Sequence, residues 1–444
     1  MPIPASQFLA DVARVAGALG GGRHVLNACV DRYRFAVGFG ASLVSGKVSL
    51  LPSTRTPEIM RQLQTFAPDV VCLTDEADCD ITLPRVQLPA TALPAAARQV
   101  PAPCLAPIPR IDSGAHAAWV FTSGSTGAPV PHRKSFGRLI ECVREEGQRL
   151  SLRDGRAHAI IATVPPQHMY GFESSVLAPL TTGNAFCAER PFYPADIRAV
   201  LEAVPAPRVL VSTPIHLRAL LGSGLELPEV ELTVSSTAPL AGSLAAEVEE
   251  RLRTTLLEIY GSTETGEIAT RRPTRATEWR LWPGVRLEPR GGETWAAGGH
   301  IEEPTRMWDV LEPVGEDRFL LHGRLADLVN IAGKRSSLAY LNHQLNSIPG
   351  VEDGAFFHAG ESPGASPAAA SHEPRVGACV VAPGLSSAEI LTALRERIDP
   401  VFLPRPLLLV QSLPRTPAGK LPQEALRALA AAALETAPRA ASVS

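Results

Sequence analysis

Runs of apolar residues alternate with amphipathic segments over the first ninety residues. The stretch 37–51 is apolar and interrupted by glycines, Pro57–Phe66 has apolar positions at helical spacing, and 70–73 is a short apolar run that ends at a Thr-Asp pair. This order predicts helix, strand, helix and strand. Alternation of this kind is typical of a parallel sheet that is covered by helices on its faces.

The pattern continues beyond residue 110. Short apolar runs at 117–120, 159–164, 208–212 and 232–236 predict further strands, and the runs after residue 150 are each followed by a turn and a helical pattern. The alanine-rich stretch 426–434 predicts a terminal helix.

Three other stretches carry no strong periodicity. Two are rich in proline and alanine: 84–109 predicts a linker, and 358–377 predicts a surface loop. The sequence GFGASL at 38–43 lacks the third glycine and the distant acidic residue of a dinucleotide fingerprint. We therefore expect its glycines to serve close packing in a buried helix.

Length and composition narrow the class of protein. A chain of 444 residues is too long for one compact core, which favours two or three domains. With 45% hydrophobic and 20% charged residues the chain is ordinary for a globular protein, and its net charge of −3 gives no reason to expect nucleic acid as a partner. Seven cysteines without a CxxC pair predict reduced thiols in a cytoplasm, and neither a signal peptide nor a membrane-spanning run is evident.

The stretch FTSGSTGAPVPHRKS at 121–135 is the first with recognisable chemistry. The predicted strand before it leads into six small residues and then a group of basic ones. Glycines let the backbone approach a ligand closely, and successive N–H groups can enclose phosphate oxygens. The loop lacks the Gly-Lys-Ser/Thr of a Walker A motif, so a phosphate-loop ATPase is not favoured. A plain flexible turn is the alternative.

Three later stretches make a plain flexible turn less favoured. EIYGSTETGEI at 258–268 predicts a turn at Tyr260-Gly261, with Glu264 just beyond it as a carboxylate suited to Mg²⁺. LLHGRLADLVNIAGKR at 320–335 joins Arg324 to a strand, and LPRTPAGKLPQEAL at 413–426 presents Lys420 on a loop. Taken singly, these stretches are also compatible with a helix cap, a hairpin and a surface lysine.

In this order, the four motifs resemble the adenylate-forming superfamily of acyl- and aryl-CoA synthetases, adenylation domains and luciferases. The resemblance covers nearly the whole chain. It is nearest to the stand-alone AMP-ligases of aryl-polyene and xanthomonadin-type pigment clusters. The roles that it implies are a phosphate loop at Thr122, Ser123, Gly124, Ser125, Thr126 and Gly127; an acyl-pocket residue, His168; an adenine-lining segment, Ser236, Thr237, Ala238 and Pro239; Tyr260 and Gly261 at the adenine; Thr263 at the α-phosphate; Glu264 on Mg²⁺; Asp309 and Arg324 at the ribose; and a mobile catalytic lysine, Lys420.

The chain departs from the superfamily pattern in four places. The usual Pro-Lys-Gly after the phosphate loop is Pro-Val-Pro, so its lysine is replaced by Val130, and we expect Arg133 or Lys134 to supply the missing charge. Asp309 lacks the preceding Thr-Gly. The hinge position is Ala326, followed by Asp327, and the segment after the hinge is LAYLN at 338–342.

The resemblance implies an α/β fold with a large N-terminal adenylation core, 1–323, and a small mobile domain, 324–444. It implies an ATP- and Mg²⁺-dependent, cytoplasmic enzyme that converts a carboxylic acid to its adenylate. The preferred acceptor is the phosphopantetheine thiol of a holo acyl carrier protein, with 4-hydroxybenzoate as the acid. Arg271, Arg272 and Arg275 would attract an acidic carrier, unless they only form a solvated face. Free coenzyme A and a non-catalytic nucleotide-binding protein are the alternatives.

Overall fold

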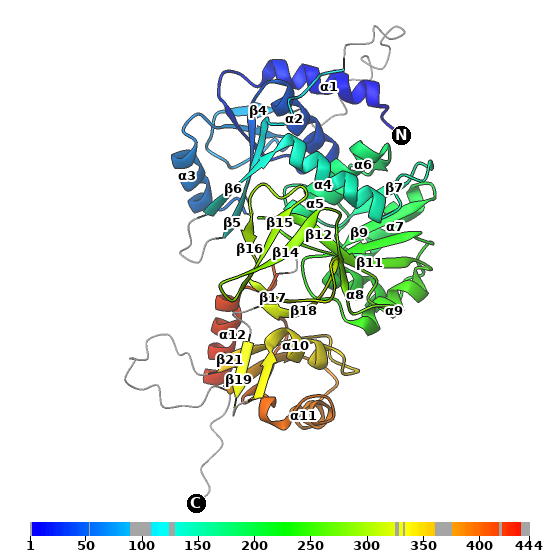
Figure 1. The fold of residues 1–444 in the computed structure, drawn as a ribbon, viewed down its shortest axis with the longest axis vertical. Helices are drawn as coiled ribbons and strands as arrows, with labels where there is room; N and C mark the ends of the chain where they lie inside the picture. The colour runs from blue at the N-terminus through cyan, green and yellow to red at the C-terminus, as the bar shows by residue number, and fades with distance from the viewer. Residues whose placement is uncertain are drawn as a thin grey trace, which may run out of the picture.

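The computed structural model describes residues 2–52, 54–88, 108–123, 129–324, 328–331, 334–359, 375–416 and 420–436. Two extended sheets with their helices form a large α/β part, and a smaller sheet with helices α10, α11 and α12 lies at one end of it (Figure 1). This arrangement confirms the predicted α/β fold class. No helix within the described ranges is both long enough and apolar enough to cross a bilayer.

The first sheet has the strand order β4-β3-β1-β2-β5-β6. Its strands are β1 (His24–Asn27), β2 (Val48–Leu51), β3 (Val71–Thr74), β4 (Arg85–Gln87), β5 (His116–Ser123) and β6 (Pro129–Ser135). The pairs are parallel except for β5 with β6, which form an antiparallel hairpin. The predicted alternation is confirmed, whereas β4 is a strand within the segment that we expected to be a linker.

Four helices pack on this sheet: α1 (Ala5–Ala18), α2 (Arg32–Val44), α3 (Pro57–Phe66) and α4 (Phe136–Arg149). The GFGASL stretch lies in α2, and a Cβ on Gly38 would stand 2.4 Å from a methyl carbon of Leu73. The prediction that these glycines serve close packing is therefore confirmed. Thr56 caps α3 by accepting from the backbone N–H of Ile59, and Pro57 occupies its first turn.

The second sheet has the strand order β17-β18-β13-β12-β11-β10-β9-β7-β8. Its strands are β7 (Ala159–Ala162), β8 (Ala185–Phe186), β9 (Arg208–Ser212), β10 (Leu232–Ser235), β11 (Thr255–Ser262), β12 (Gly266–Arg271), β13 (Trp279–Leu281), β17 (Asp309–Pro313) and β18 (Arg318–Arg324). From β7 to β11 the strands are parallel, and beyond β11 they are antiparallel. The predicted strands at 159–164, 208–212 and 232–236 are thus confirmed.

Helices and a small sheet complete this part. The helices are α5 (Met169–Phe172), the π-helical turn η2 (Glu173–Leu177), α6 (Ala178–Thr182), α7 (Pro194–Ala203), α8 (Pro214–Gly222) and α9 (Gly242–Arg251). The small sheet contains β14 (Val285–Arg290), β15 (Glu293–Gly298) and β16 (Thr305–Arg306). The first three helical elements form one continuous run, which begins directly after His168.

The C-terminal part has separate hydrophobic clusters of its own. Its elements are β19 (Leu328–Ile331), β20 (Lys334–Ser337), α10 (Leu338–Asn346), β21 (Asp353–Ala359), β22 (Arg375–Val381), α11 (Ser387–Arg395), η5 (Pro400–Phe402), β23 (Leu407–Leu409) and α12 (Gln423–Thr436). The predicted terminal helix is confirmed as α12. The expected surface loop 358–377 overlaps the ends of β21 and β22, and residues 360–374 lie outside the described part.

A direct contact joins the two parts. The guanidinium of Arg218, on α8, donates to the backbone carbonyl of Glu352 at 2.9 Å and lies 3.8 Å from a carboxylate oxygen of Asp353. The same carboxylate accepts two hydrogen bonds from Arg415. The division at residue 323 remains a proposal, and the expected hinge residues Ala326 and Asp327 lie outside the described residues.

Candidate active site

The hairpin that carries Glu264 has its turn later in the chain than we expected. Tyr260 and Gly261 lie within β11, and the turn is formed by the residues after Ser262. The pairing with β12 continues on both sides of a register shift at Tyr260-Gly261. A Cβ on Gly261 would come within 2.3 Å of the Gly266 carbonyl oxygen, so the close approach of the two strands requires glycine here. Thr263 and Glu264 therefore lie at the tip of an antiparallel hairpin, which corrects the predicted turn at Tyr260-Gly261.

Side-chain hydrogen bonds hold this tip in shape. The backbone N–H of Thr265 donates to the Ser262 hydroxyl, and the backbone N–H of Ser262 donates to the Thr265 hydroxyl, each at 3.2 Å. Glu264 is half-buried. These two hydrogen bonds fix the backbone of the turn, and with it the position of Glu264.

The beginning of the phosphate loop faces the same tip. Nε2 of His132, on β6, lies 2.9 Å from the Thr122 hydroxyl and 3.6 Å from a Glu264 carboxylate oxygen. Ser123 ends β5, and the remaining loop residues of the prediction, Gly124, Ser125, Thr126 and Gly127, lie outside the described residues. His132 is therefore the side chain that connects the loop to the hairpin, a role that we did not predict for it.

A second group of predicted site residues lies around Tyr260, on β11. The Tyr260 hydroxyl donates to a carboxylate oxygen of Asp309 at 2.6 Å, and Asp309 pairs with Arg324 between β17 and β18. The hydroxyl of Ser236 donates to the carbonyl of Ile259, next to Tyr260, at 2.9 Å. The structure thus brings together residues that are separated by up to 88 positions in the sequence.

The predicted adenine-lining segment includes an unusual backbone angle. Thr237 has φ of +80°, and it stands between Ser236 and Ala238-Pro239. A β-branched residue rarely adopts positive φ, and such strain is frequent at ligand sites. The strained backbone makes this segment a candidate ligand site.

His168, directly before α5, and Lys420, in the C-terminal part, are close enough in space for the lysine charge to act on the imidazole. Nδ1 of His168 is enclosed and has no hydrogen-bond partner among the described residues. Burial, together with the nearby Lys420 ammonium, lowers the pKa of His168 to about 4. A neutral imidazole with an unpartnered buried nitrogen, next to a cation, is suited to a small polar ligand such as a carboxylic acid.

Sequence reasoning missed a cluster of three buried glutamates behind the hairpin: Glu146 on α4, Glu173 on η2 and Glu267 on β12. The Cys142 thiol donates to Glu173 at 3.1 Å, and the Ser174 hydroxyl donates to Glu267 at 2.8 Å. Glu146 occurs on an otherwise apolar helical face, after Leu139, Cys142 and Val143, and that placement was the available signal.

Burial controls the charge of this cluster. Burial and, to a smaller extent, the neighbouring glutamates raise the pKa of Glu146 to about 8 and that of Glu267 well above its usual range. Burial also raises the pKa of Glu173 to about 7, an increase that the Lys134 ammonium opposes. Glu173 is therefore the member most readily ionised.

We expect Glu146→Gln to become progressively more stable than the wild type as the pH rises from 5 to 8. Burial raises the folded-state pKa of Glu146 from 4.5 to about 8, so over this interval the unfolded chain releases a proton that the folded chain retains. The wild type loses stability as a result, whereas the glutamine variant does not. Urea unfolding at pH 5, 6.5 and 8 measures the difference. Glu141→Gln, exposed on the same helix, is the control, and a pH-independent difference for Glu146→Gln would contradict the prediction.

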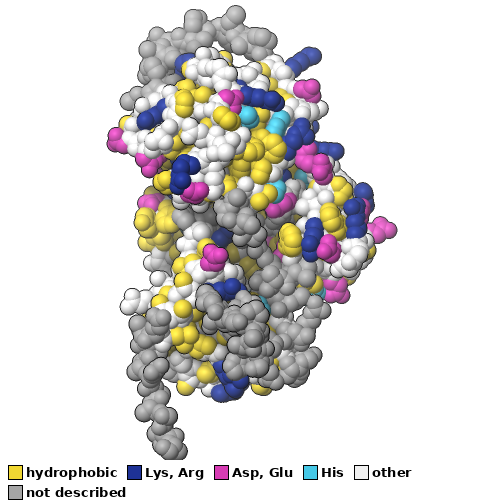
Figure 2. Space-filling model, turned by 90° about the vertical axis from the view of Figure 1, so that its left-hand side faces the viewer, with side chains coloured by type: hydrophobic (Ala, Val, Ile, Leu, Met, Phe, Trp, Pro, Cys, Tyr) yellow, Lys and Arg dark blue, Asp and Glu magenta, His cyan; other side chains and the backbone are white. Residues whose placement is uncertain are grey.

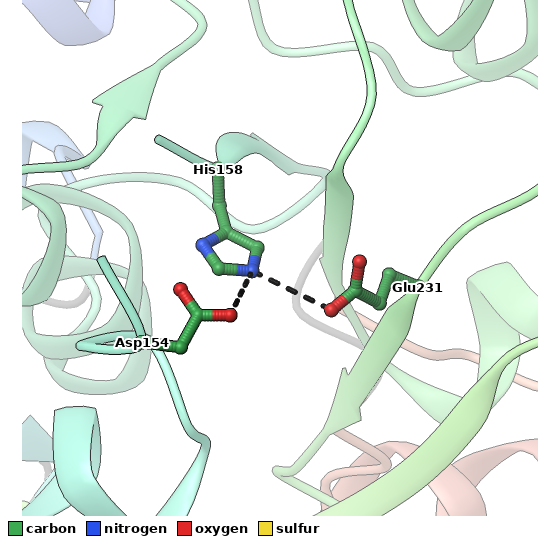
Figure 3. A group of neighbouring side chains, drawn as sticks. All are labelled: Asp154, His158 and Glu231. Atoms are coloured by element: carbon green, nitrogen blue, oxygen red, sulfur yellow. Dashed lines mark ion pairs between the residues drawn. The ribbon is translucent and has the colours of Figure 1, made fainter. Parts of the chain in front are cut away.

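Another group of acids and a histidine lies away from these residues. Nε2 of His158 is 3.9 Å from Asp154 and 3.6 Å from Glu231, with the ring between the two carboxylates (Figure 3). The guanidinium of Arg156 already bridges these carboxylates, at 2.6 Å from Asp154 and 2.9 Å from Glu231. We therefore interpret the group as an ion-pair network that ties the segment before β7 to the segment before β10.

Two of the three arginines that we expected to attract a carrier protein, Arg271 and Arg272, have acidic partners. Arg271 donates to Glu258 at 2.6 Å, and Arg272 makes two hydrogen bonds to Glu249 at 2.8 and 3.0 Å. On the face in Figure 2, basic and acidic side chains are interspersed and do not gather into one basic area. These contacts weaken the argument for a basic docking surface at Arg271 and Arg272.

Comparison with solved structures shows the same fold. ATP-bound MatB from Rhodopseudomonas palustris aligns with a TM-score of 0.78 and 21% identity over 95% of this chain and 92% of that one. A benzoate CoA ligase from Burkholderia xenovorans LB400 aligns with a TM-score of 0.76 and 18% identity over 95% and 92%. At these identities the likeness concerns the fold.

Sequence comparison identifies the family. The 4-coumarate–CoA ligase of Rhodobacter capsulatus is 30% identical over 236 residues, which cover 52% of this chain and 58% of that protein, so the match spans little more than half of the relative. The family model described as AMP-binding enzyme matches residues 6–287. The resemblance to adenylate-forming enzymes is thereby confirmed, and the chain belongs to the AMP-binding enzyme family.

Proposed function

We propose that this protein uses ATP to convert a carboxylic acid to an acyl adenylate and then passes the acyl group to a thiol. The proposal rests on two groups of residues, each of which draws its members from distant parts of the chain. Thr122, His132 and Glu264 form one group, and His168 and Lys420 form the other. The first is suited to phosphates and the second to a carboxylate.

The first step joins two anions. A carboxylate oxygen attacks the α-phosphorus of ATP, the bond from that phosphorus to the bridging oxygen breaks, and pyrophosphate leaves. Lys420 would stand between the partners as a compact positive charge, and the Thr263 hydroxyl would contact the α-phosphate. Tyr260, Asp309 and the adenine segment would fix the nucleoside.

The residues at the hairpin tip fit a magnesium ion. Glu264 supplies a carboxylate and Thr122 a hydroxyl, which are the oxygen ligands that a hard cation prefers, and both face the same His132 nitrogen. Bound there, Mg²⁺ would offset phosphate charge. Glu264 would hold the ion while the tip hydrogen bonds keep its backbone in place.

The second step needs space for a thiol. The thiolate attacks the acyl carbon, the bond to the phosphate oxygen breaks, and AMP leaves. Lys420 would have to withdraw, and movement of the C-terminal part about a hinge would remove it. The hydrogen bond from Arg218 to the Glu352 carbonyl is one of the contacts that such a movement would break.

An aromatic acid, with 4-hydroxybenzoate as the first candidate, agrees with the names of the relatives, which include coumarate and benzoate ligases. These names also favour coenzyme A as the acceptor. The carrier protein, which we preferred as the acceptor, rests on the resemblance to pigment-cluster ligases and stays a prediction. Both acceptors present the same phosphopantetheine thiol.

We expect pyrophosphate exchange into ATP only when an acid is added, with aryl acids exchanged faster than aliphatic ones. Exchange without acid, or net ATP hydrolysis alone, would contradict the proposal, and nucleotide binding without exchange would favour the non-catalytic alternative. Adding coenzyme A or a holo carrier protein to the active mixture then decides the acceptor. Thioester on coenzyme A and none on a carrier would overturn the carrier alternative.

A further inference from the structure

We propose that Lys134 is a positioning residue, which holds the hairpin tip carrying Thr263 and Glu264 in the orientation that MgATP requires, with Glu173 as its buried counter-ion. The inference rests on the proposed function and deepens it. It gives Lys134 a role through the Glu264 backbone and not through contact with phosphates.

Lys134 reaches the tip from the neighbouring sheet. It lies on β6, and alternation along a strand places its side chain on the same face as that of His132. Its residue is only 5% exposed, and its Nζ donates to the Glu264 carbonyl oxygen at 2.9 Å. A charge-assisted hydrogen bond to this carbonyl fixes the backbone of the residue that would hold the metal ion.

A buried ammonium needs nearby negative charge. Lys134 and Glu173 line one small void of about 10 Å³, together with Cys142, Gly266, His300 and Glu302. Glu173 and Glu302 are the two carboxylates that line this void beside Lys134, and Glu173 is only 1% exposed. We therefore take Glu173, the fully buried member of the two, as the counter-ion of the ammonium.

The hairpin packs directly against this counter-ion. A Cβ on Gly266 would lie 2.9 Å from a Glu173 carboxylate oxygen and 3.4 Å from His300. Glycine at this position has φ of +72° and lets the hairpin approach the cluster. The hairpin thus packs against Glu173 at Gly266, and Lys134 donates a hydrogen bond to its tip.

The neighbouring positions do not offer the same contact. Arg133 is exposed, and alternation along β6 directs it to the opposite face. Val130, at the position of the superfamily lysine, is an exposed hydrophobic residue. Our expectation that Arg133 or Lys134 supplies charge to the phosphates is therefore replaced by a positioning role for Lys134.

The test compares Lys134→Met with Lys134→Arg, Glu173→Gln and Arg133→Met by titration calorimetry, without any acid present. The probes are MgATP, ATP with EDTA, and AMP. We expect Lys134→Met to weaken MgATP binding by about tenfold, because small displacements of a binding group are costly, and to leave AMP binding within about twofold. Lys134→Arg should restore part of the MgATP affinity, Glu173→Gln should reduce it in the same direction, and Arg133→Met should match the wild type.

Unchanged MgATP affinity in Lys134→Met, or an equal loss for AMP and MgATP, would overturn the proposal. If Lys134→Met does not fold, Glu173→Gln carries the test, and wild-type MgATP affinity in that variant would likewise overturn it. Failure of the proposed function is separate, since it would show as absent acid-dependent exchange in the wild type.

Discussion

Replacing Lys420 with alanine is expected to slow adenylate formation by about 100-fold or more, because a preorganised cation at developing charge contributes that much to rate. Two hydrogen bonds join the backbone of Lys420 to Thr416. The Lys420 N–H donates to the Thr416 hydroxyl, and the Lys420 carbonyl accepts from the Thr416 N–H. Its charge acts on His168, the residue that we propose lines the acid pocket. Pyrophosphate exchange measures this half-reaction.

The second half-reaction supplies the discriminating measurement for Lys420. Thiol transfer from a synthetic acyl adenylate should proceed at near the wild-type rate in Lys420→Ala, because the lysine acts only while the phosphate bond is exchanged. Arg395→Ala, an exposed cation in the last turn of α11, is the matched control and should leave both rates unchanged. Equal loss in both half-reactions would indicate a structural role instead.

Glu264→Gln should reduce acid-dependent exchange by about 100-fold, because a metal ion stabilises phosphate charge by several kcal/mol and each 1.4 kcal/mol corresponds to tenfold in rate. The substitution keeps the shape of the side chain and removes its charge. The Mg²⁺ concentration for half-maximal rate should rise, while binding of AMP without metal should change little. Steady-state rates over a Mg²⁺ series, with calorimetry for AMP, measure the two quantities.

Glu303→Gln removes an exposed carboxylate from the same large α/β part and is the control for Glu264. It should reproduce the wild-type Mg²⁺ dependence. If Glu264→Gln also keeps that dependence, then Glu264 does not hold the ion, and the hairpin tip would act through Thr263 and the backbone alone.

The local pattern of the sequence determined most of the elements. Pro57–Phe66 forms the predicted helix with Thr56 as its cap, and the apolar runs from 159 to 236 form adjacent parallel strands. These features depend on neighbours in the chain, because periodicity, capping and β-branched runs act over a few residues. The four motifs in order were also enough to identify the adenylate-forming family.

Only the tertiary structure showed which side chains meet. In the sequence, Lys134 looks like an ordinary surface lysine. In the structure, β6 pairs antiparallel with β5 and brings Lys134 to the Glu264 hairpin, 130 residues away in the chain. Arg271 and Arg272 look like part of a basic patch in the sequence, but in the structure Glu258 and Glu249 offset their charge. The buried glutamates are unrecognisable as a cluster in the sequence, because their charge state is decided by burial and by mutual proximity, which are properties of the packed sheets.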